Sequence, residues 1–208
     1  RMTDTSCEEL RFAGLLHDIG KLGIPEAVLF KAGKLTQEEY ETIKRHPAVT
    51  RQILGSIHFP RKMKNVPEIA STHHERVNGS GYPDGLKIEK IPLGGRMLAM
   101  ADVFDALTSR RQYRDRESIE KVCETIDKEN GQTFDPEVVK IFLEIPVNKL
   151  IAIMEYDQKD RLDYAELGKI SAIPLKEILK LKSKKTEELS KKQKTSLNIF
   201  DKYYQRNY

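Results

Sequence analysis

The chain has 208 residues, of which 38% are hydrophobic and 33% charged, and its net charge is +4. This composition excludes a disordered chain, and the apolar stretches are too short for a membrane span, which needs about 20 residues. Cys7 and Cys123 are single and far apart, which argues against a disulfide framework or a zinc ribbon. With no signal segment at its start, we expect a cytoplasmic protein.

The first predicted helix leads into a histidine and an aspartate. Leu10, Ala13 and Gly14 recur at the spacing of one helical face, which continues to His17 and Asp18. A carboxylate in apolar surroundings is costly to bury unless it binds a cation or forms an ion pair. Alternatively, His17 is a helix-end histidine favoured by the dipole, and Asp18 caps the next turn. These residues alone leave both interpretations open.

The second predicted helix opens with a capping box. Thr36 and Glu39 have the spacing of that motif, and the pattern predicts a helix that carries Ile43 and His46 and ends at Pro47. A lone histidine at a helix end is more often structural than a ligand, so His46 by itself indicates little.

The third predicted helix starts near Pro67 and continues to the adjacent pair His73 and His74. Neutral imidazoles are the commonest protein ligands for transition metals, and two in a row can reach two ions. The glycine-rich segment 79–85 that follows is the densest turn signal in the chain, and we expect a loop there.

A long helix is predicted over residues 95–109, with Asp102 on the same face as Leu98 and Ala101. An unpaired carboxylate on an apolar face is destabilising, so a metal ion or Arg96 is expected to satisfy Asp102.

Further helices are predicted over residues 118–129 and 136–143. No segment has a convincing strand pattern, although residues 60–67 and 86–92 have room for short extended pieces. The sequence therefore predicts an all-α fold.

We predict a domain boundary near Pro146, which gives a first domain over residues 1–146 and a helical extension over 147–208. Between Lys176 and Arg206 there are ten lysines and arginines against four acidic residues, so the rest of the chain is slightly acidic. A lysine-rich amphipathic helix is most often a solvated helix packed by one face. Dimerisation or an anionic partner is the alternative, and no nucleic-acid-binding motif is present.

The histidines and aspartates singled out above share one chemistry. They offer nitrogen and oxygen donors without a thiolate, a set that suits iron or manganese better than a structural zinc. Two ions roughly 3.5–4 Å apart can hold a bridging hydroxide and stabilise a displacement at phosphorus. The residues therefore indicate a multi-metal hydrolase.

The order and spacing of these motifs resemble the HD-GYP family, a branch of the HD-domain phosphohydrolases. The matching blocks are His17-Asp-Ile-Gly-Lys21, the stretch from Lys31 to Pro47, His73-His-Glu-Arg-Val-Asn-Gly-Ser-Gly-Tyr-Pro83, Ala101 to Ser109 and Gly131 to Pro136.

This resemblance implies an HD-domain helical bundle with extra HD-GYP helices, and a phosphodiesterase that hydrolyses cyclic di-GMP to pGpG or GMP in bacterial signalling. It also implies two or three metal ions, most often iron and alternatively manganese. By motif matching the metal ligands are His17, Asp18, His46, His73, His74 and Asp102. Asp18 is the expected bridging carboxylate.

Substrate contacts are expected beside the metals. Lys21 is placed to meet the phosphate or to assist the leaving oxygen, and Asp18 and Lys21 are the candidate catalytic pair. In the loop, Gly81, Tyr82 and Pro83 allow close backbone approach and offer a stacking face. Arg111 and Arg114 are candidates to hold the second phosphate.

The sequence also departs from the family pattern. Val77 and Asn78 stand where the family usually has Trp and Asp, and Arg110 and Gln112 where it usually has Asp and Pro. A family ligand helix farther upstream has no counterpart in the sixteen residues before His17, so we expect that helix to be missing. Two alternatives therefore remain: an enzyme for another cyclic dinucleotide, and a signalling module that binds cyclic di-GMP with little turnover. Besides cyclic di-GMP, the candidate partners are a second copy of the chain or a signalling protein.

Overall fold

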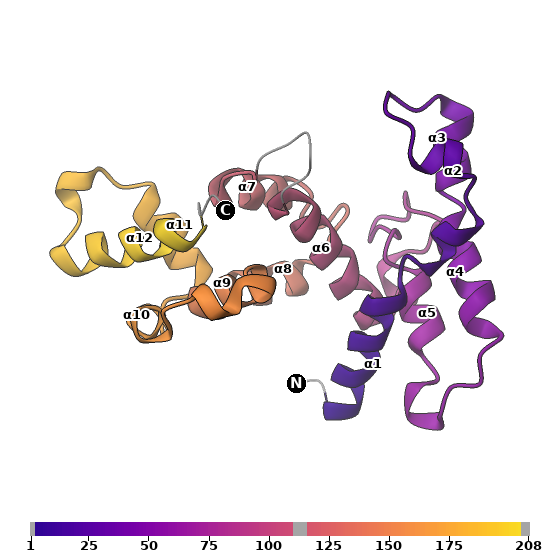
Figure 1. The fold of residues 1–208 in the computed structure, drawn as a ribbon, viewed down its shortest axis with the longest axis horizontal. Helices are drawn as coiled ribbons and strands as arrows, with labels where there is room; N and C mark the ends of the chain where they lie inside the picture. The colour runs from indigo at the N-terminus through magenta and orange to yellow at the C-terminus, as the bar shows by residue number, and fades with distance from the viewer. Residues whose placement is uncertain (1–2, 110–115, 205–208) are drawn as a thin grey trace. The chain divides into compact units, whose positions relative to one another are not determined.

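The computed structural model describes residues 3–109 and 116–204, and the regular structure within them is helical (Figure 1). The helices are α1 (Asp4–Leu16), α2 (Glu26–Leu29), α3 (Gln37–Ile43), α4 (His46–Gly55), α5 (Val66–Ser71), α6 (Leu93–Thr108), α7 (Ile119–Lys128), α8 (Pro136–Leu143), α9 (Val147–Met154), α10 (Tyr164–Gly168), α11 (Leu175–Lys182) and α12 (Lys191–Tyr204). The all-α prediction is confirmed. No described helix combines the length and the apolar character needed to cross a membrane.

The two segments in which short extended pieces were expected contain 3₁₀ turns instead, η2 (Arg61–Met63) and η3 (Ile88–Lys90). Extended pairing in the described chain is limited to isolated bridges such as that between Asn78 and Lys87. The predicted extended pieces are therefore wrong for most of their length, because local turns satisfy the backbone there.

The chain forms two compact units. One consists of the residues up to Val103 together with Glu129–Val138, and the other of Phe104–Lys128 and Val139–Tyr208. Helices α6 and α8 contribute residues to both units. The domain boundary predicted near Pro146 is a different division, and it stays a prediction.

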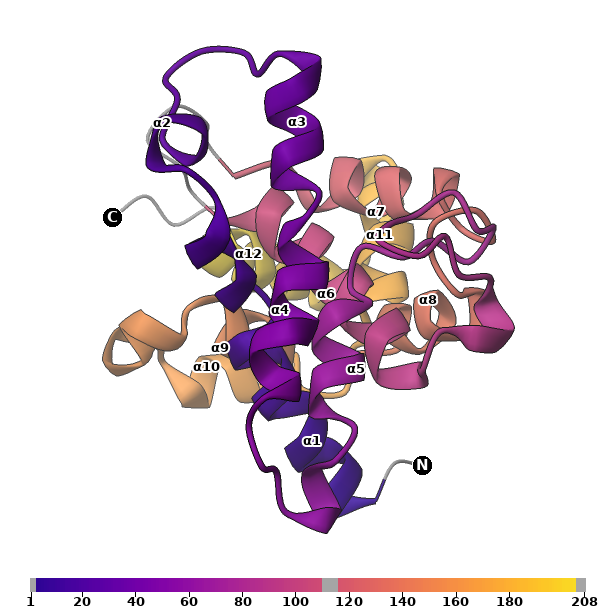
Figure 2. The same cartoon turned by 90° about the vertical axis from the view of Figure 1, so that its right-hand side faces the viewer.

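The core of the first unit lies between α1, α4 and α5, where α5 packs against both of the others (Figure 2). The buried residues of this core are Ala13 of α1, Leu54 of α4, and Val66, Ile69 and Ala70 of α5. Ala13 belongs to the apolar face that predicted α1. The packing fixes the ends of three helices close together, and those ends carry the histidines.

The capping box at Thr36 and Glu39 is confirmed, but helix α3 ends at Ile43 and His46 begins a new helix. The prediction that His46 ends the earlier helix is wrong. Pro47 lies in the first turn of α4, where its missing N–H costs nothing because the first backbone N–H groups of a helix have no partner within the helix.

Helix α5 starts near Pro67 as predicted but ends at Ser71, so His73 and His74 follow the helix instead of lying on it. The hydroxyls of Ser71 and Thr72 both donate to the Glu68 carbonyl, at 3.2 and 2.9 Å. Such bonds compete with the helical ladder and account for an end one turn earlier than predicted.

In the second unit, the lysine-rich segment buries one face of each of its helices. Leu175, Ile178 and Leu181 of α11 are buried, and so are Phe200 and Tyr203 of α12. The lysines lie mainly on the opposite faces. This is the arrangement of solvated helices packed by one side.

Candidate metal centre

Five side chains of the first unit meet at helix ends. His17 follows the end of α1, Asp18 precedes the 3₁₀ turn η1 (Ile19–Gly23), His46 opens α4, and His73 and His74 come just after α5. Asp102 lies on a further helix, α6, with its Oδ1 3.8 Å from His17 Nε2. The structure thus brings together all six residues predicted as metal ligands.

Three of the histidines are held in the same way by their own backbone. The Nδ1 atoms of His17, His46 and His73 lie 2.6, 2.8 and 2.7 Å from the carbonyl oxygens three residues earlier, in Gly14, Ile43 and Ala70 respectively. A carbonyl only accepts hydrogen bonds, so each Nδ1 carries the proton and donates. In the neutral ring, Nε2 is then left as a lone-pair donor for a metal, which is how metal-binding histidines are usually oriented.

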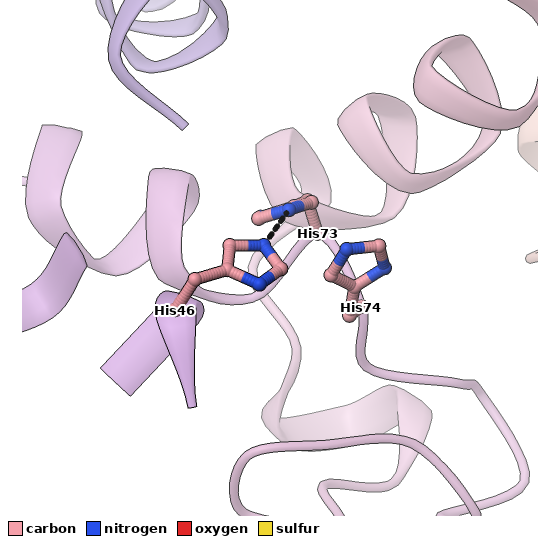
Figure 3. Close-up of side chains that lie close together, drawn as sticks. All are labelled: His46, His73 and His74. Atoms are coloured by element: carbon pink, nitrogen blue, oxygen red, sulfur yellow. Dashed lines mark hydrogen bonds between the residues drawn. The ribbon is translucent and has the colours of Figure 1, made fainter. Parts of the chain in front are cut away.

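The free nitrogen atoms point toward one another. His46 Nε2 and His73 Nε2 are 3.3 Å apart (Figure 3). With both Nδ1 positions protonated, neither neutral ring has a hydrogen to place between these atoms. Two lone pairs at this distance repel unless a proton or a metal cation lies between or beside them. The donor set therefore fits a bound metal.

Asp18 turns its two oxygens toward different partners. Oδ1 lies 3.3 Å from His46 Nε2 and 3.9 Å from His73 Nε2. Oδ2 lies 3.4 Å from His17 Nε2 and 2.5 Å from the ammonium of Lys21. A carboxylate placed in this way can serve two ions.

The donor atoms form two overlapping groups of three, each within 4.8 Å. One group is His46, His73 and His74, and the other is His17, Asp18 and His73. Their shared member, His73, is buried. The geometry has room for more than one ion, and the role of each residue as a ligand stays a prediction.

Lowered pKa values keep three of these side chains deprotonated, which is the form that binds metal ions. Burial lowers the pKa of His73 to about 4 and that of His74 to about 3, so both rings are neutral at pH 7. Burial alone would raise the pKa of Asp18, but the hydrogen bond from the Lys21 ammonium and the positive charge of Lys21 outweigh it and hold that pKa well below its usual range.

The contacts of the His17-Asp18 pair distinguish between its two interpretations. His17 does bond the end of its own helix through Nδ1, as the structural alternative expects, while its Nε2 faces the carboxylates. Asp18, by contrast, makes no capping hydrogen bond to the next turn. The capping role considered for Asp18 is wrong, because its oxygens are engaged by His46 and Lys21.

Thr50, which the sequence reasoning missed, joins the His-Asp segment to α4. Its hydroxyl oxygen accepts from Gly20 N at 3.0 Å and donates to His17 O at 2.8 Å. A Cβ on Gly20 would lie 2.0 Å from the carbonyl oxygen of His46, so only glycine fits between the two segments. Thr50 lies one helical turn after His46, and that spacing was the available signal.

Arg96 pairs with another carboxylate: its Nη1 lies 2.5 Å from Oδ2 of Asp135, which is buried. His17 is one side chain that faces Asp102, with 3.8 Å between Nε2 and Oδ1.

The glycine-rich loop lies beside the cluster, as predicted. The Tyr82 ring stacks on that of His74 with 4.8 Å between centroids, and Tyr82 N donates to His74 O at 3.1 Å. The Tyr82-Pro83 peptide is cis. Burial raises the pKa of the Tyr82 phenol, so it keeps its proton. Arg111 and Arg114 lie outside the described residues.

A cavity lies beside Asp18. Asp18 and Lys21 line a cavity of about 380 Å³ together with apolar residues that include Leu16 and Ile19. A ligand that enters this cavity can reach the carboxylate and the ammonium directly.

Comparison with known proteins identifies relatives of this chain. A family model described as HD domain matches residues 1–138. A protein of Thermotoga maritima named cyclic di-GMP phosphodiesterase is 44% identical over 144 residues, which is 69% of this chain and 39% of that protein.

Two further relatives differ in their named activities. The cyclic di-GMP phosphodiesterase response regulator RpfG of Xanthomonas campestris is 44% identical over 65% of this chain and 36% of its own length. The 3'3'-cGAMP-specific phosphodiesterase 2 of Vibrio cholerae is 38% identical over 69% of this chain and 27% of its own length. The chain thus spans well under half of each of these relatives.

Proposed function

The chain belongs to the HD-domain family, and we propose that it is a metal-dependent phosphodiesterase of the HD-GYP type that hydrolyses cyclic di-GMP to pGpG, GMP or both. The observation that carries this proposal is the meeting of His46 Nε2 and His73 Nε2 at 3.3 Å with both Nδ1 atoms committed to carbonyls. The names of the relatives from Thermotoga and Xanthomonas support the substrate.

The six converging residues would hold the metal: His17, Asp18, His46, His73, His74 and Asp102. Nitrogen and oxygen donors without thiolate favour iron or manganese, and two overlapping donor groups favour two or three ions. When bound, such ions polarise a phosphoryl oxygen and lower the pKa of a bound water.

The remaining residues bind and orient the substrate. The Lys21 ammonium lies 2.5 Å from Asp18 Oδ2, and both residues line the cavity. There the ammonium can exchange its carboxylate partner for a phosphate oxygen, or donate a proton to the leaving ribose oxygen. Tyr82 offers a ring for stacking with a guanine, beside the Lys44 ammonium that lies 5.4 Å from its centroid, and Gly81 and Pro83 shape the loop around it. Arg111 and Arg114 remain candidates for the second phosphate.

A second candidate function follows from the Vibrio relative, which is named for a different cyclic dinucleotide. Val77 and Asn78, which depart from the family pattern, begin the loop that carries Tyr82. The same centre would then act on 3'3'-cGAMP. A signalling module that binds cyclic di-GMP without turnover, a homodimer and a cytoplasmic location stay predictions.

The test combines metal analysis with hydrolysis assays of the full-length protein. We expect wild type to contain iron or manganese and to hydrolyse cyclic di-GMP faster than 3'3'-cGAMP. Asp18→Ala should lose metal and activity together. The reverse substrate preference would establish the second function, and tight binding without product in the metal-loaded protein would establish the signalling module.

Equal metal content and activity in wild type and Asp18→Ala would overturn the assignment of the site. Lys140 is exposed on α8, and Lys140→Ala is the control. It should leave the metal content and the hydrolysis rate unchanged.

A further inference from the structure

Glu75 directly follows the histidine pair and is only 3% exposed. A buried carboxylate is costly unless hydrogen bonds satisfy it. Here Oε1 accepts from Asp84 N and Oε2 from Leu86 N, each at 2.8 Å. Both oxygens of one side chain are thus used to hold two backbone amides at the far end of the glycine-rich loop.

The near part of the same loop is attached to the preceding residue, His74. Tyr82 N donates to His74 O at 3.1 Å, and the two rings stack with 4.8 Å between centroids. Two adjacent residues, His74 and Glu75, therefore hold three backbone amides and one aromatic ring of the loop.

The loop lies directly on this pair of residues. A Cβ on Gly81 would be 2.3 Å from Arg76 N and 2.5 Å from Glu75 Cα, so a side chain at that position would push the loop away. On the outer side, Arg51 pairs with the Asp84 carboxylate and its Nε lies 3.2 Å from Ser71 Oγ. The Arg51 and Asp84 side chains are 43% and 40% exposed, so water weakens this outer contact. Glu75 supplies the buried one.

We propose that Glu75 is a positioning residue for the substrate rim: its carboxylate fixes the loop so that Tyr82 stays on the ring of His74. The part of this inference that concerns substrate rests on the proposed function. The part that concerns the loop rests on the contacts alone. Glu75 acts through Tyr82 and is not itself a metal ligand.

The test is Glu75→Gln in the full-length, metal-loaded protein. Glutamine keeps the size of the side chain but offers only one acceptor oxygen. Its NH₂ group would face the other backbone N–H, and two donors cannot form a hydrogen bond. Charge-assisted bonds to backbone amides are about twice as strong as neutral ones. We expect hydrogen exchange of the loop amides to accelerate and KM for cyclic di-GMP to rise, each about tenfold. The kcat should stay within about threefold, with metal content unchanged.

Glu89→Gln is the matched control, since Glu89 is an exposed glutamate in η3 just beyond the loop. It removes the same charge and should leave exchange, KM, kcat and metal content as in wild type. If Glu75→Gln fails to fold by circular dichroism, Glu75→Asp, which keeps the charge on a shorter side chain, is measured in its place, with the same direction of change expected.

Unchanged exchange of the loop amides would overturn the proposal. So would loss of metal with the loop unaffected, because that result would assign Glu75 to the metal centre. If wild type hydrolyses no cyclic dinucleotide, the proposed function fails, and the exchange measurement still decides whether Glu75 holds the loop.

Discussion

Two buried polar clusters, one in each unit, pair their atoms in opposite ways. In the second unit, Arg116 donates from Nε to Thr108 O and from Nη1 to Tyr204 O, both at 2.7 Å, and from Nη2 to the buried Glu155 at 3.0 Å. Every one of these contacts joins a donor to an acceptor. In the first unit, His46 and His73 turn acceptor atoms toward each other and toward the Asp18 carboxylate.

This difference separates a structural cluster from a binding site. A donor that is hydrogen-bonded to an acceptor is satisfied, and neither group needs another partner. Acceptors that meet acceptors are stable only with a cation among them. The comparison predicts that damage to the first cluster is measured mainly as lost ligand and activity, and damage to the second mainly as lost stability.

The largest expected effect is that of His73→Ala. His73 belongs to both donor groups, so its loss should release metal and lower kcat by about a thousandfold or more, as removal of electrostatic stabilisation of the transition state does. Metal analysis and a single-turnover assay measure the two effects. Removing a buried ring that also bonds Ala70 O lowers stability by itself, so stability is compared with His73→Gln, which fills more of the site. In chelator, this variant should unfold at nearly the same urea concentration as metal-free wild type, because the lost Nε2 faced other acceptors. A large drop in the urea midpoint would mean that His73 stabilises the fold, as the Arg116 contacts do.

Arg116→Ala should give the converse result. Removing one partner of a buried ion pair costs about 3–5 kcal/mol because the other charge is left unpaired, and Glu155 is only 4% exposed. Urea unfolding measures the loss, and metal content per folded molecule should not change. Lys121→Ala is the control, because Lys121 forms an exposed pair with Glu117 that contributes at most about 1 kcal/mol. Equal losses in both variants would contradict the structural role of the Arg116 cluster.

The metal-free protein should lose stability as the pH falls from about 6.5 to about 4. Burial lowers the pKa of His73 from 6.5 to about 4, so in this window the unfolded chain binds a proton that the folded chain does not. Stability therefore rises with pH, by about 3 kcal/mol for this residue across the window. His74 acts in the same direction.

Urea unfolding at several pH values in chelator measures this dependence, and His73→Gln should remove the part due to His73. A flat profile between pH 7 and pH 5 would mean that the folded cluster accepts protons as readily as the unfolded chain does.

Much of this structure follows from local sequence signals. The capping box at Thr36 and Glu39 and the helix at Pro136–Leu143 lie where the sequence predicts them, because caps and apolar periodicity act within one or two turns. The error at His46 is also local, since a proline suits the first turn of a helix as well as the residue after its end.

The contacts that build the site could not be predicted in the same way. Thr50 bonds a segment 30 residues earlier, and the buried Glu9 accepts from Asn65 N, 56 residues later. The spacing of Thr50 from His46 indicates that Thr50 faces the site, but it does not identify the bonded segment, because packing of α1, α4 and α5 brings these distant segments together. The candidate ligands were predicted from their motifs, and the direction of their lone pairs required the structure.

The smallest effect on stability is expected for Thr50→Val, which keeps the shape of the side chain but leaves Gly20 N–H and His17 C=O without their partner. Unsatisfied buried backbone groups cost about 1–3 kcal/mol. The same bonds hold the His17-Asp18 segment against α4, so metal affinity should fall about 10- to 100-fold, as when a partner that orients a metal ligand is removed. Urea unfolding and metal titration measure the two losses.

Thr195→Val is the matched control in the second unit, because Thr195 is exposed on α12 and its hydroxyl donates only to Lys191 O. It should change stability by less than about 0.5 kcal/mol and leave metal affinity unchanged. If Thr50→Val loses stability but keeps its metal affinity, the close fit of Gly20 against His46 sets the position of the His17-Asp18 segment. The Thr50 hydroxyl would then contribute to stability alone, as the Arg116 contacts of the second unit do.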